Sequence, residues 1–189
     1  MGKIVVVAAS FGGVAALARI VSGLSGPCGA TFLVVLHIGA LPSLLPDILG
    51  QVTTLPVTHA VDGAPIEPGH IYVAPPDRHM LVEPGRVRLS TGPKVKHTGP
   101  AADPLFTSAA EAYGSSVVGI VLTGWDGDGA EGLRAIKEHG GLAIVQDPSK
   151  ALASEMPAHA IAADHPDLCL SLDEIAAKLR EFCKVDQME

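Results

Sequence analysis

The stretch Ile4–Gly13 reads IVVVAASFGG, a sequence that joins a buried strand to a tight turn and the start of a helix. The apolar, mostly β-branched run Ile4–Ala9 is typical of a strand that is buried on both faces. The two glycines favour a turn, and Val14 and Leu17 then begin the apolar spacing of a helix. Ser10, where the strand ends, is open to three interpretations: a helix cap, the start of a phosphate-binding turn, or a nucleophile.

Strands and helices alternate along the rest of the chain. Runs rich in β-branched residues predict strands at Ile4–Ala9, Thr31–Leu36, Pro56–Ala60, His70–Ala74, Val117–Leu122 and Leu142–Val145. Helical spacing occurs at residues 14–21, 41–52, 103–114, 129–140 and 171–185. This order predicts an α/β fold, a doubly wound and mostly parallel sheet flanked by helices. Residues 79–90 contain a Glu-Pro-Gly turn between two alternating runs, which predicts an antiparallel hairpin at the edge of that sheet.

Length and composition narrow the class of protein. The 189 residues suit one domain, and 48% of them are hydrophobic, with a mean hydropathy of +0.36. The longest apolar runs are shorter than the roughly 20 residues of a membrane-spanning helix, and the N-terminus lacks a signal-peptide pattern. We therefore expect a cytoplasmic protein that does not insert into membranes. The net charge of −7 argues against nucleic acid as a partner.

The cysteines and one basic cluster have simple interpretations. Cys28, Cys169 and Cys183 are odd in number and widely spaced, which predicts buried apolar side chains and neither a disulfide framework nor a metal site. The segment 86–97, RVRLSTGPKVKH, fits either a solvated hairpin or a docking surface for an acidic partner. Its basic residues are Arg86, Arg88, Lys94, Lys96 and His97.

Candidate catalytic residues follow three of the predicted strands. In a doubly wound sheet, ligands and catalytic groups gather beyond the carboxyl ends of the strands. The first strand ends at Ser10, the second at His37, and Val117–Leu122 leads into a loop with Asp126 and Asp128. A neutral imidazole can take the proton of a serine hydroxyl, and a carboxylate can orient that imidazole and stabilise its charged form. Together these residue types indicate nucleophilic acyl chemistry.

Each of these residues alone also has a structural interpretation. Ser10 fits a helix cap, His37 a hydrogen-bonded core histidine, and the aspartates fit turn residues or metal ligands. The segment DGDGAEGL fails the EF-hand pattern, and AASFGG lacks the glycine spacing of a nucleotide-binding turn. If Ser10 is the nucleophile, Gly12 allows a tight turn, and backbone N–H groups beginning with Phe11 are placed to receive the oxyanion.

Several motifs together resemble the catalytic domain of the chemotaxis protein-glutamate methylesterases, the CheB type. AASFGG resembles the nucleophile motif GASTGG, VLHIGA follows the second strand in a QHM-like context, and LTGWDGDG resembles LTGMGxDG. Further similar segments are VAPPDRHMLV, PAADPLFTSAA and AIVQDPSKALASEMPAHAI. The resemblance covers about residues 4–180 and, aligned residue by residue, assigns the catalytic aspartate to Asp128.

The resemblance implies a serine hydrolase that removes methyl esters from glutamate side chains of chemoreceptors, releases methanol, and also deamidates some glutamines. It implies Ser10 as nucleophile, His37 as base and Asp128 as its partner, with Phe11, Gly12 and Trp125 around them. It implies neither a metal nor an organic cofactor. The implied partners are the cytoplasmic helices of methylated receptors. Typical family members carry an N-terminal phosphoacceptor receiver domain. Here we expect residues 1–189 to be a single catalytic domain, with regulation open to a separate protein.

Three residues depart from the family motifs. Phe11 stands in place of threonine, Trp125 in place of methionine, and Asp126 in place of glycine. The extra carboxylate of Asp126 predicts a raised pKa for His37. The two bulky side chains leave two alternatives to methylesterase activity: a binding module of the same fold without turnover, or an esterase or amidase for another acyl substrate.

Overall fold

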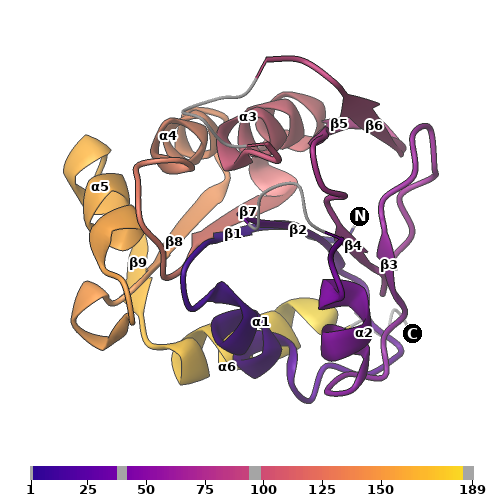
Figure 1. Ribbon diagram of the computed structural model, residues 1–189, viewed down its shortest axis with the longest axis horizontal. Helices are drawn as coiled ribbons and strands as arrows, with labels where there is room; N and C mark the ends of the chain where they lie inside the picture. The colour runs from indigo at the N-terminus through magenta and orange to yellow at the C-terminus, as the bar shows by residue number, and fades with distance from the viewer. Residues whose placement is uncertain (1, 38–41, 94–98, 185–189) are drawn as a thin grey trace.

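A parallel sheet forms the centre of the computed structural model, which describes residues 2–37, 42–93 and 99–184 (Figure 1). Within these residues its strands are β1 (Ile4–Ala9), β2 (Thr31–Leu36), β3 (Val57–His59), β4 (Ile71–Val73), β7 (Val117–Val121), β8 (Leu142–Gln146) and β9 (Leu168–Leu170). They lie in the order β3-β4-β2-β1-β7-β8-β9, and every pairing is parallel. The chain leaves β1 toward β2 and later returns to β7 on the other side, so strand order reverses at β1.

Helices cover both faces of the sheet (Figure 1). They are α1 (Gly13–Val21), α2 (Leu45–Gly50), α3 (Ala102–Tyr113), α4 (Ala130–Glu138), α5 (Glu155–Ala163) and α6 (Leu172–Cys183), with short 3-10 turns η1 (Gly114–Ser116) and η2 (Pro148–Lys150). In β1, Val6 packs into the core under α3, α4 and α5, whereas Val5 and Val7 pack into the core under α1, α2 and α6. A strand that is buried on both faces explains why this run is continuously apolar.

The predicted fold class is confirmed, with three differences in detail. The hairpin of β5 (His79–Glu83) and β6 (Arg86–Ser90) forms its own two-stranded sheet instead of extending the edge of the main sheet. It packs on α3, where Ser108 Oγ accepts the backbone N–H of Val82 at 3.0 Å. Strand β9 was not predicted; it has three residues that are not fully buried. Helix α5 was not predicted either; Pro157 lies in its first turn, a position that a helix tolerates.

The cysteine prediction was wrong at two points. Cys28 and Cys183 are buried but form a disulfide, with Cα atoms 4.2 Å apart and 155 residues between them in sequence. Cys169 is exposed. The end of α6 lies against the loop before β2, where the backbone N–H of Gly29 donates to the Cys183 carbonyl at 3.0 Å. This contact between distant segments has no local pattern that would predict it.

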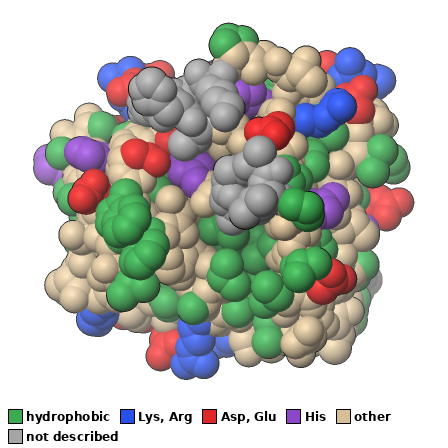
Figure 2. Space-filling model, in the orientation of Figure 1, with side chains coloured by type: hydrophobic (Ala, Val, Ile, Leu, Met, Phe, Trp, Pro, Cys, Tyr) green, Lys and Arg blue, Asp and Glu red, His purple; other side chains and the backbone are tan. Residues whose placement is uncertain are grey.

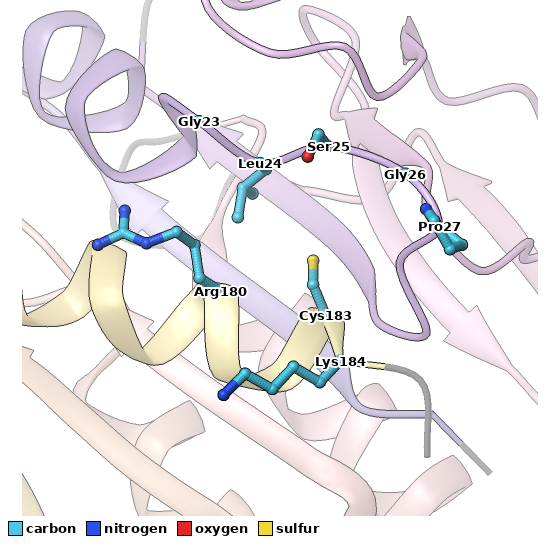
Figure 3. Close-up of a pocket in the computed structure, with 8 residues that line it drawn as sticks. All are labelled: Gly23, Leu24, Ser25, Gly26, Pro27, Arg180, Cys183 and Lys184. Atoms are coloured by element: carbon cyan, nitrogen blue, oxygen red, sulfur yellow. The ribbon is translucent and has the colours of Figure 1, made fainter. Parts of the chain in front are cut away.

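A cavity of ≈ 270 Å³ lies beside this disulfide (Figure 3). It is lined by the turn of residues 23–27 and by Arg180, Cys183 and Lys184 of the α6 end. Because the turn precedes β2, the cavity lies at the amino ends of the strands, opposite the end where Ser10 and His37 are found.

The described part of the basic cluster is paired with acidic neighbours. Arg86 lies 3.6 Å from Glu83, and Arg88 lies 3.5 Å from Asp62, in each case between exposed side chains. These pairs fit the interpretation of a solvated hairpin. Lys94, Lys96 and His97 lie outside the described residues.

Candidate active site

Strand register brings Ser10 and His37 to neighbouring positions. In the pairing of β1 with β2, Ala9 lies opposite Leu36, and the backbone N–H of His37 donates to the Ala9 carbonyl at 3.0 Å. On the other side of β1, the backbone N–H of Ser10 donates to the Thr123 carbonyl at 3.0 Å. Both residues therefore stand at carboxyl ends of central strands where strand order reverses, the place where α/β sheets bind ligands.

The turn after Ser10 excludes its role as a helix cap. The cap position of α1 is Gly12, with φ +77°, and no side chain bonds to the helix start there. The positive φ is what favours glycine in this turn, and a Cβ on Gly12 would lie 2.9 Å from Leu152 Cδ2. Within the described parts of the chain, the N–H groups of Phe11 and Gly12 donate no hydrogen bond. These two donors are open to an oxyanion.

His37 contacts Asp128 directly. Its Nε2 lies 2.7 Å from Asp128 Oδ2, and Asp128 is 1% exposed. The same carboxylate accepts the first two N–H groups of α3, from Ala102 at 2.6 Å and from Asp103 at 3.0 Å. Burial raises the pKa of Asp128, but the hydrogen bonds from His37 and from these two amides outweigh it, so the pKa is lowered. Asp128 is therefore ionised at neutral pH.

Asp103 makes a reciprocal contact with the helix that follows Asp128. Its Oδ1 accepts the backbone N–H groups of Gly129, at 2.9 Å, and Gly132, at 2.8 Å, at the start of α4. Asp128 thus accepts N–H groups at the start of α3, and Asp103 accepts N–H groups at the start of α4. N–H groups at these positions lack partners within their own helix. The arrangement fixes the position of Asp128 against His37.

The second nitrogen of His37 faces another carboxylate. Nδ1 lies 3.4 Å from Asp126 Oδ2 and is buried, without a hydrogen-bond partner in the described structure. Burial lowers the pKa of His37, but the hydrogen bond and charge of Asp128 and the charge of Asp126 outweigh it and raise the pKa. Asp126 has φ +91°, a conformation that fits the glycine of the family motif, and its Oδ1 accepts the Asp128 N–H at 2.8 Å.

This contact gives a prediction for the charge of His37. In an Asp126→Asn variant, the imidazolium loses one neighbouring negative charge, so the pKa of His37 is expected to fall. Asparagine tolerates a positive φ and keeps an acceptor for the Asp128 N–H, which makes it a conservative change. The measurement is an NMR titration of the His37 ring in both proteins. An unchanged titration midpoint would show that Asp126 does not act on His37.

Thr123 and Gly124, which follow β7, lie against the backbone and Cβ of Ser10. Buried Gln146 accepts the N–H of Thr123 through Oε1 at 2.9 Å, which fixes the end of β7. A Cβ on Gly124 would lie 2.6 Å from Ser10 Cβ and 2.2 Å from Met156 Sδ. Only glycine therefore allows Ser10 and Met156 to approach this backbone so closely.

Gly124→Ala is accordingly expected to displace Ser10. We predict a loss of about tenfold or more in the rate at which a fluorophosphonate labels Ser10, because a displacement of about 1 Å costs catalytic groups up to 10²-fold. Gly50→Ala is the matched control, since a Cβ at Gly50 meets no atom within 4 Å. Equal labelling of both variants would contradict the prediction.

Phe11 and Trp125 lie together at the surface beside Ser10. Their rings stack with centroids 4.2 Å apart and an angle of 8° between planes. Phe11 is 46% exposed and Trp125 is 54% exposed. They therefore form a stacked, half-exposed aromatic pair in the turn after Ser10 and the loop after β7.

The supporting roles of Asp103, Thr123 and Gln146 were not predicted from the sequence. Asp103 falls within the motif PAADPLFTSAA, and Gln146 within AIVQDPSKALASEMPAHAI, so both lie in segments that were noticed without a role. Thr123 was signalled by a hydroxyl at the end of a buried strand.

The described residues hold no group of three His, Cys, Asp or Glu side chains suited to a metal. None of their helices is long and apolar enough to span a bilayer.

Serine, histidine and aspartate at the carboxyl ends of a doubly wound sheet are the side-chain types that a serine hydrolase uses. The chain belongs to the CheB methylesterase family, whose family model matches residues 5–179. The crystal structure of the Thermotoga maritima CheB methylesterase catalytic domain superposes with a TM-score of 0.90 at 33% identity, covering 96% of this chain and 98% of that one.

Curated relatives agree with this assignment. A Leptospira interrogans protein assigned as a protein-glutamate methylesterase/protein-glutamine glutaminase is 38% identical over 185 residues, which cover 97% of this chain and 94% of that protein. Protein-glutamate methylesterase/protein-glutamine glutaminase 2 of Anaeromyxobacter dehalogenans is 39% identical, over 96% of this chain but 54% of its own length. The chain thus spans nearly the whole of one relative and about half of the other.

Proposed function

We propose that this chain hydrolyses γ-glutamyl methyl esters on the cytoplasmic helices of chemoreceptors, releasing methanol and restoring the glutamate carboxylate. The family membership and the names of the relatives support the activity. The names also include glutaminase activity, so we propose that the same site deamidates glutamine side chains and releases ammonia.

The proposed mechanism assigns one role to each candidate residue. Ser10 Oγ attacks the ester carbonyl, and His37 takes the serine proton at Nδ1 and delivers it to the departing methanol oxygen. Asp128 holds the His37 ring through Nε2 and stabilises its charged form. The N–H groups of Phe11 and Gly12 receive the negative charge on the carbonyl oxygen. Water, activated by His37, then cleaves the acyl-enzyme.

The observation that carries this mechanism is that the two nitrogens of His37 differ in their hydrogen bonding. Nε2 is bound to Asp128 at 2.7 Å, while Nδ1 is buried and makes no hydrogen bond to any described residue. Nδ1 also lies 3.4 Å from Asp126 Oδ2. Because Asp128 occupies Nε2, the mechanism assigns proton transfer with Ser10 to Nδ1, the ring nitrogen that makes no hydrogen bond to a described residue. In structures without substrate, the hydrogen bonds of catalysis are often long and tighten only on binding.

The positions of Phe11 and Trp125 favour an enzyme over a binding module. The binding hypothesis rests on these side chains crowding the site. They instead stack on each other and remain about half exposed, so neither ring is packed into the interior at the site.

The test measures methanol and ammonia in parallel. The substrates are two receptor segments that differ only in carrying a glutamate γ-methyl ester or a glutamine at one position. We expect methanol from the first and slower ammonia release from the second, because an amide has the poorer leaving group. Hydrolysis of small activated esters without either product would indicate another acyl substrate, and no turnover of any ester would indicate a binding module.

A further inference from the structure

Three exposed apolar side chains surround the nucleophile turn, each from a loop that follows a different strand. Phe11 follows β1, Trp125 follows β7 and Leu152 follows β8, and these strands are neighbours in the sheet. Leu152 is 72% exposed, more than either aromatic ring. We call these three side chains the apolar platform. Figure 2 shows exposed hydrophobic side chains gathered in groups on one face of the molecule.

The members of the apolar platform are packed around the turn after Ser10. Phe11 and Trp125 stack at 4.2 Å. Leu152 lies over Gly12, since a Cβ on that glycine would be 2.9 Å from Leu152 Cδ2 and 3.1 Å from Leu152 Cβ. The platform is thus contiguous with the turn that carries the proposed nucleophile.

Thr123 fixes the three loops to one another. Its hydroxyl lies 3.0 Å from the Phe11 carbonyl oxygen and accepts the Ala153 N–H at 2.8 Å. The N–H of Gly124 donates to the Ala153 carbonyl at 3.0 Å. Thr123 is itself 2% exposed, so this junction is shielded from water. The platform is therefore held in place before any substrate binds, which lowers the entropic cost of binding.

The net charge of the chain does not favour the approach of an acidic segment. The chain carries a net charge of −7, and the side chain of Asp126 beside the site is 33% exposed. A segment whose esters derive from glutamates has negatively charged neighbours, so long-range attraction is unfavourable. Exposed apolar patches with aromatic residues are typical of interaction surfaces, and here they offer the contact that charge does not.

We propose that the apolar platform selects substrates with a large apolar side chain one helical turn away from the esterified glutamate. This inference rests on the proposed function. Residues four apart on a helix have Cβ atoms about 5–6 Å from each other, and the Cα atoms of Ser10 and Phe11 are about 3.8 Å apart, as in any trans dipeptide. A helix that presents its ester to Ser10 and runs along the platform would place its neighbouring turn on these side chains.

The test uses two helical peptides, each with one glutamate γ-methyl ester. One peptide has leucine four residues before and four residues after the ester, and the other has serine at both positions. We expect kcat/KM for methanol release to be about tenfold or more higher with the leucine peptide, the discrimination typical of an apolar contact. Leu152→Ser and Trp125→Met should each bring this ratio toward one. Val61→Ser, which removes a 65% exposed side chain outside the platform, should preserve it.

The outcomes separate this inference from the proposed function. Equal kcat/KM values for the two peptides, with methanol released from both, would overturn the platform's role and leave the methylesterase assignment intact. An unchanged ratio in Leu152→Ser and Trp125→Met would overturn it as well. Absence of methanol from both peptides, while a small activated ester is cleaved, would overturn the proposed function and this inference with it.

Discussion

The Ser10→Ala variant is expected to hydrolyse a glutamate γ-methyl ester at least about 10⁴-fold more slowly than the wild type, because removal of a serine nucleophile abolishes the covalent route. Alanine differs from serine only in lacking the hydroxyl. The backbone N–H at this position keeps the hydrogen bond that Ser10 donates to the Thr123 carbonyl. The measurement is kcat for methanol release from an esterified peptide. Any remaining rate should come from binding and from the oxyanion donors alone.

Ser25→Ala is the control for this prediction. Ser25 is an exposed serine in the turn before β2, at the opposite end of the strands. Its replacement should leave kcat within about twofold of the wild type, as expected for an exposed substitution away from the site. A Ser10→Ala variant that retains the wild-type rate would exclude Ser10 as the nucleophile.

The Asp128→Asn variant is expected to lose about 10⁴-fold in kcat, because an amide neither fixes the required tautomer of His37 nor stabilises its charged form. It should also lose about 1–3 kcal/mol of unfolding free energy, since a buried acceptor of the α3 amides is weakened. The two effects have different causes. A second variant is needed to separate them.

Asp103→Asn supplies that separation. It weakens the reciprocal contact, in which Asp103 accepts the N–H groups of Gly129 and Gly132, without changing the partner of His37. We expect a similar loss of unfolding free energy, measured by denaturant titration, with a much smaller loss of kcat. Equal losses of kcat in the two variants would mean that Asp128 acts only by holding the helices together.

Local periodicity was sufficient to predict most of the fold. The β-branched runs predicted six strands of the main sheet, and the alternation with helices predicted that these strands run parallel. Short elements gave weaker signals: β9 has three partly exposed residues, and Pro157 interrupts the helical pattern of α5. The disulfide between Cys28 and Cys183 depends on how the last helix packs against the loop before β2, which no local pattern encodes.

The candidate site could be predicted only in part. Ser10 and His37 follow from their places at the ends of two strands that the sheet brings together. From the residue types alone, either Asp126 or Asp128 could be the carboxylate that pairs with His37. The family motif favoured Asp128. The structure places Asp128 against Nε2 and Asp126 near Nδ1 of His37. The catalytic roles stay predictions. The support from Asp103 depends on two helix starts facing each other, which becomes visible only in three dimensions.

The central claim is that Ser10 is the nucleophile of a glutamyl methylesterase. The most direct test is methanol release from methylated chemoreceptor membranes, compared between the wild type and Ser10→Ala at equal concentrations of folded protein. We predict sustained release by the wild type and release near background by the variant. Equal release by both proteins, or none by a folded wild type, would contradict it.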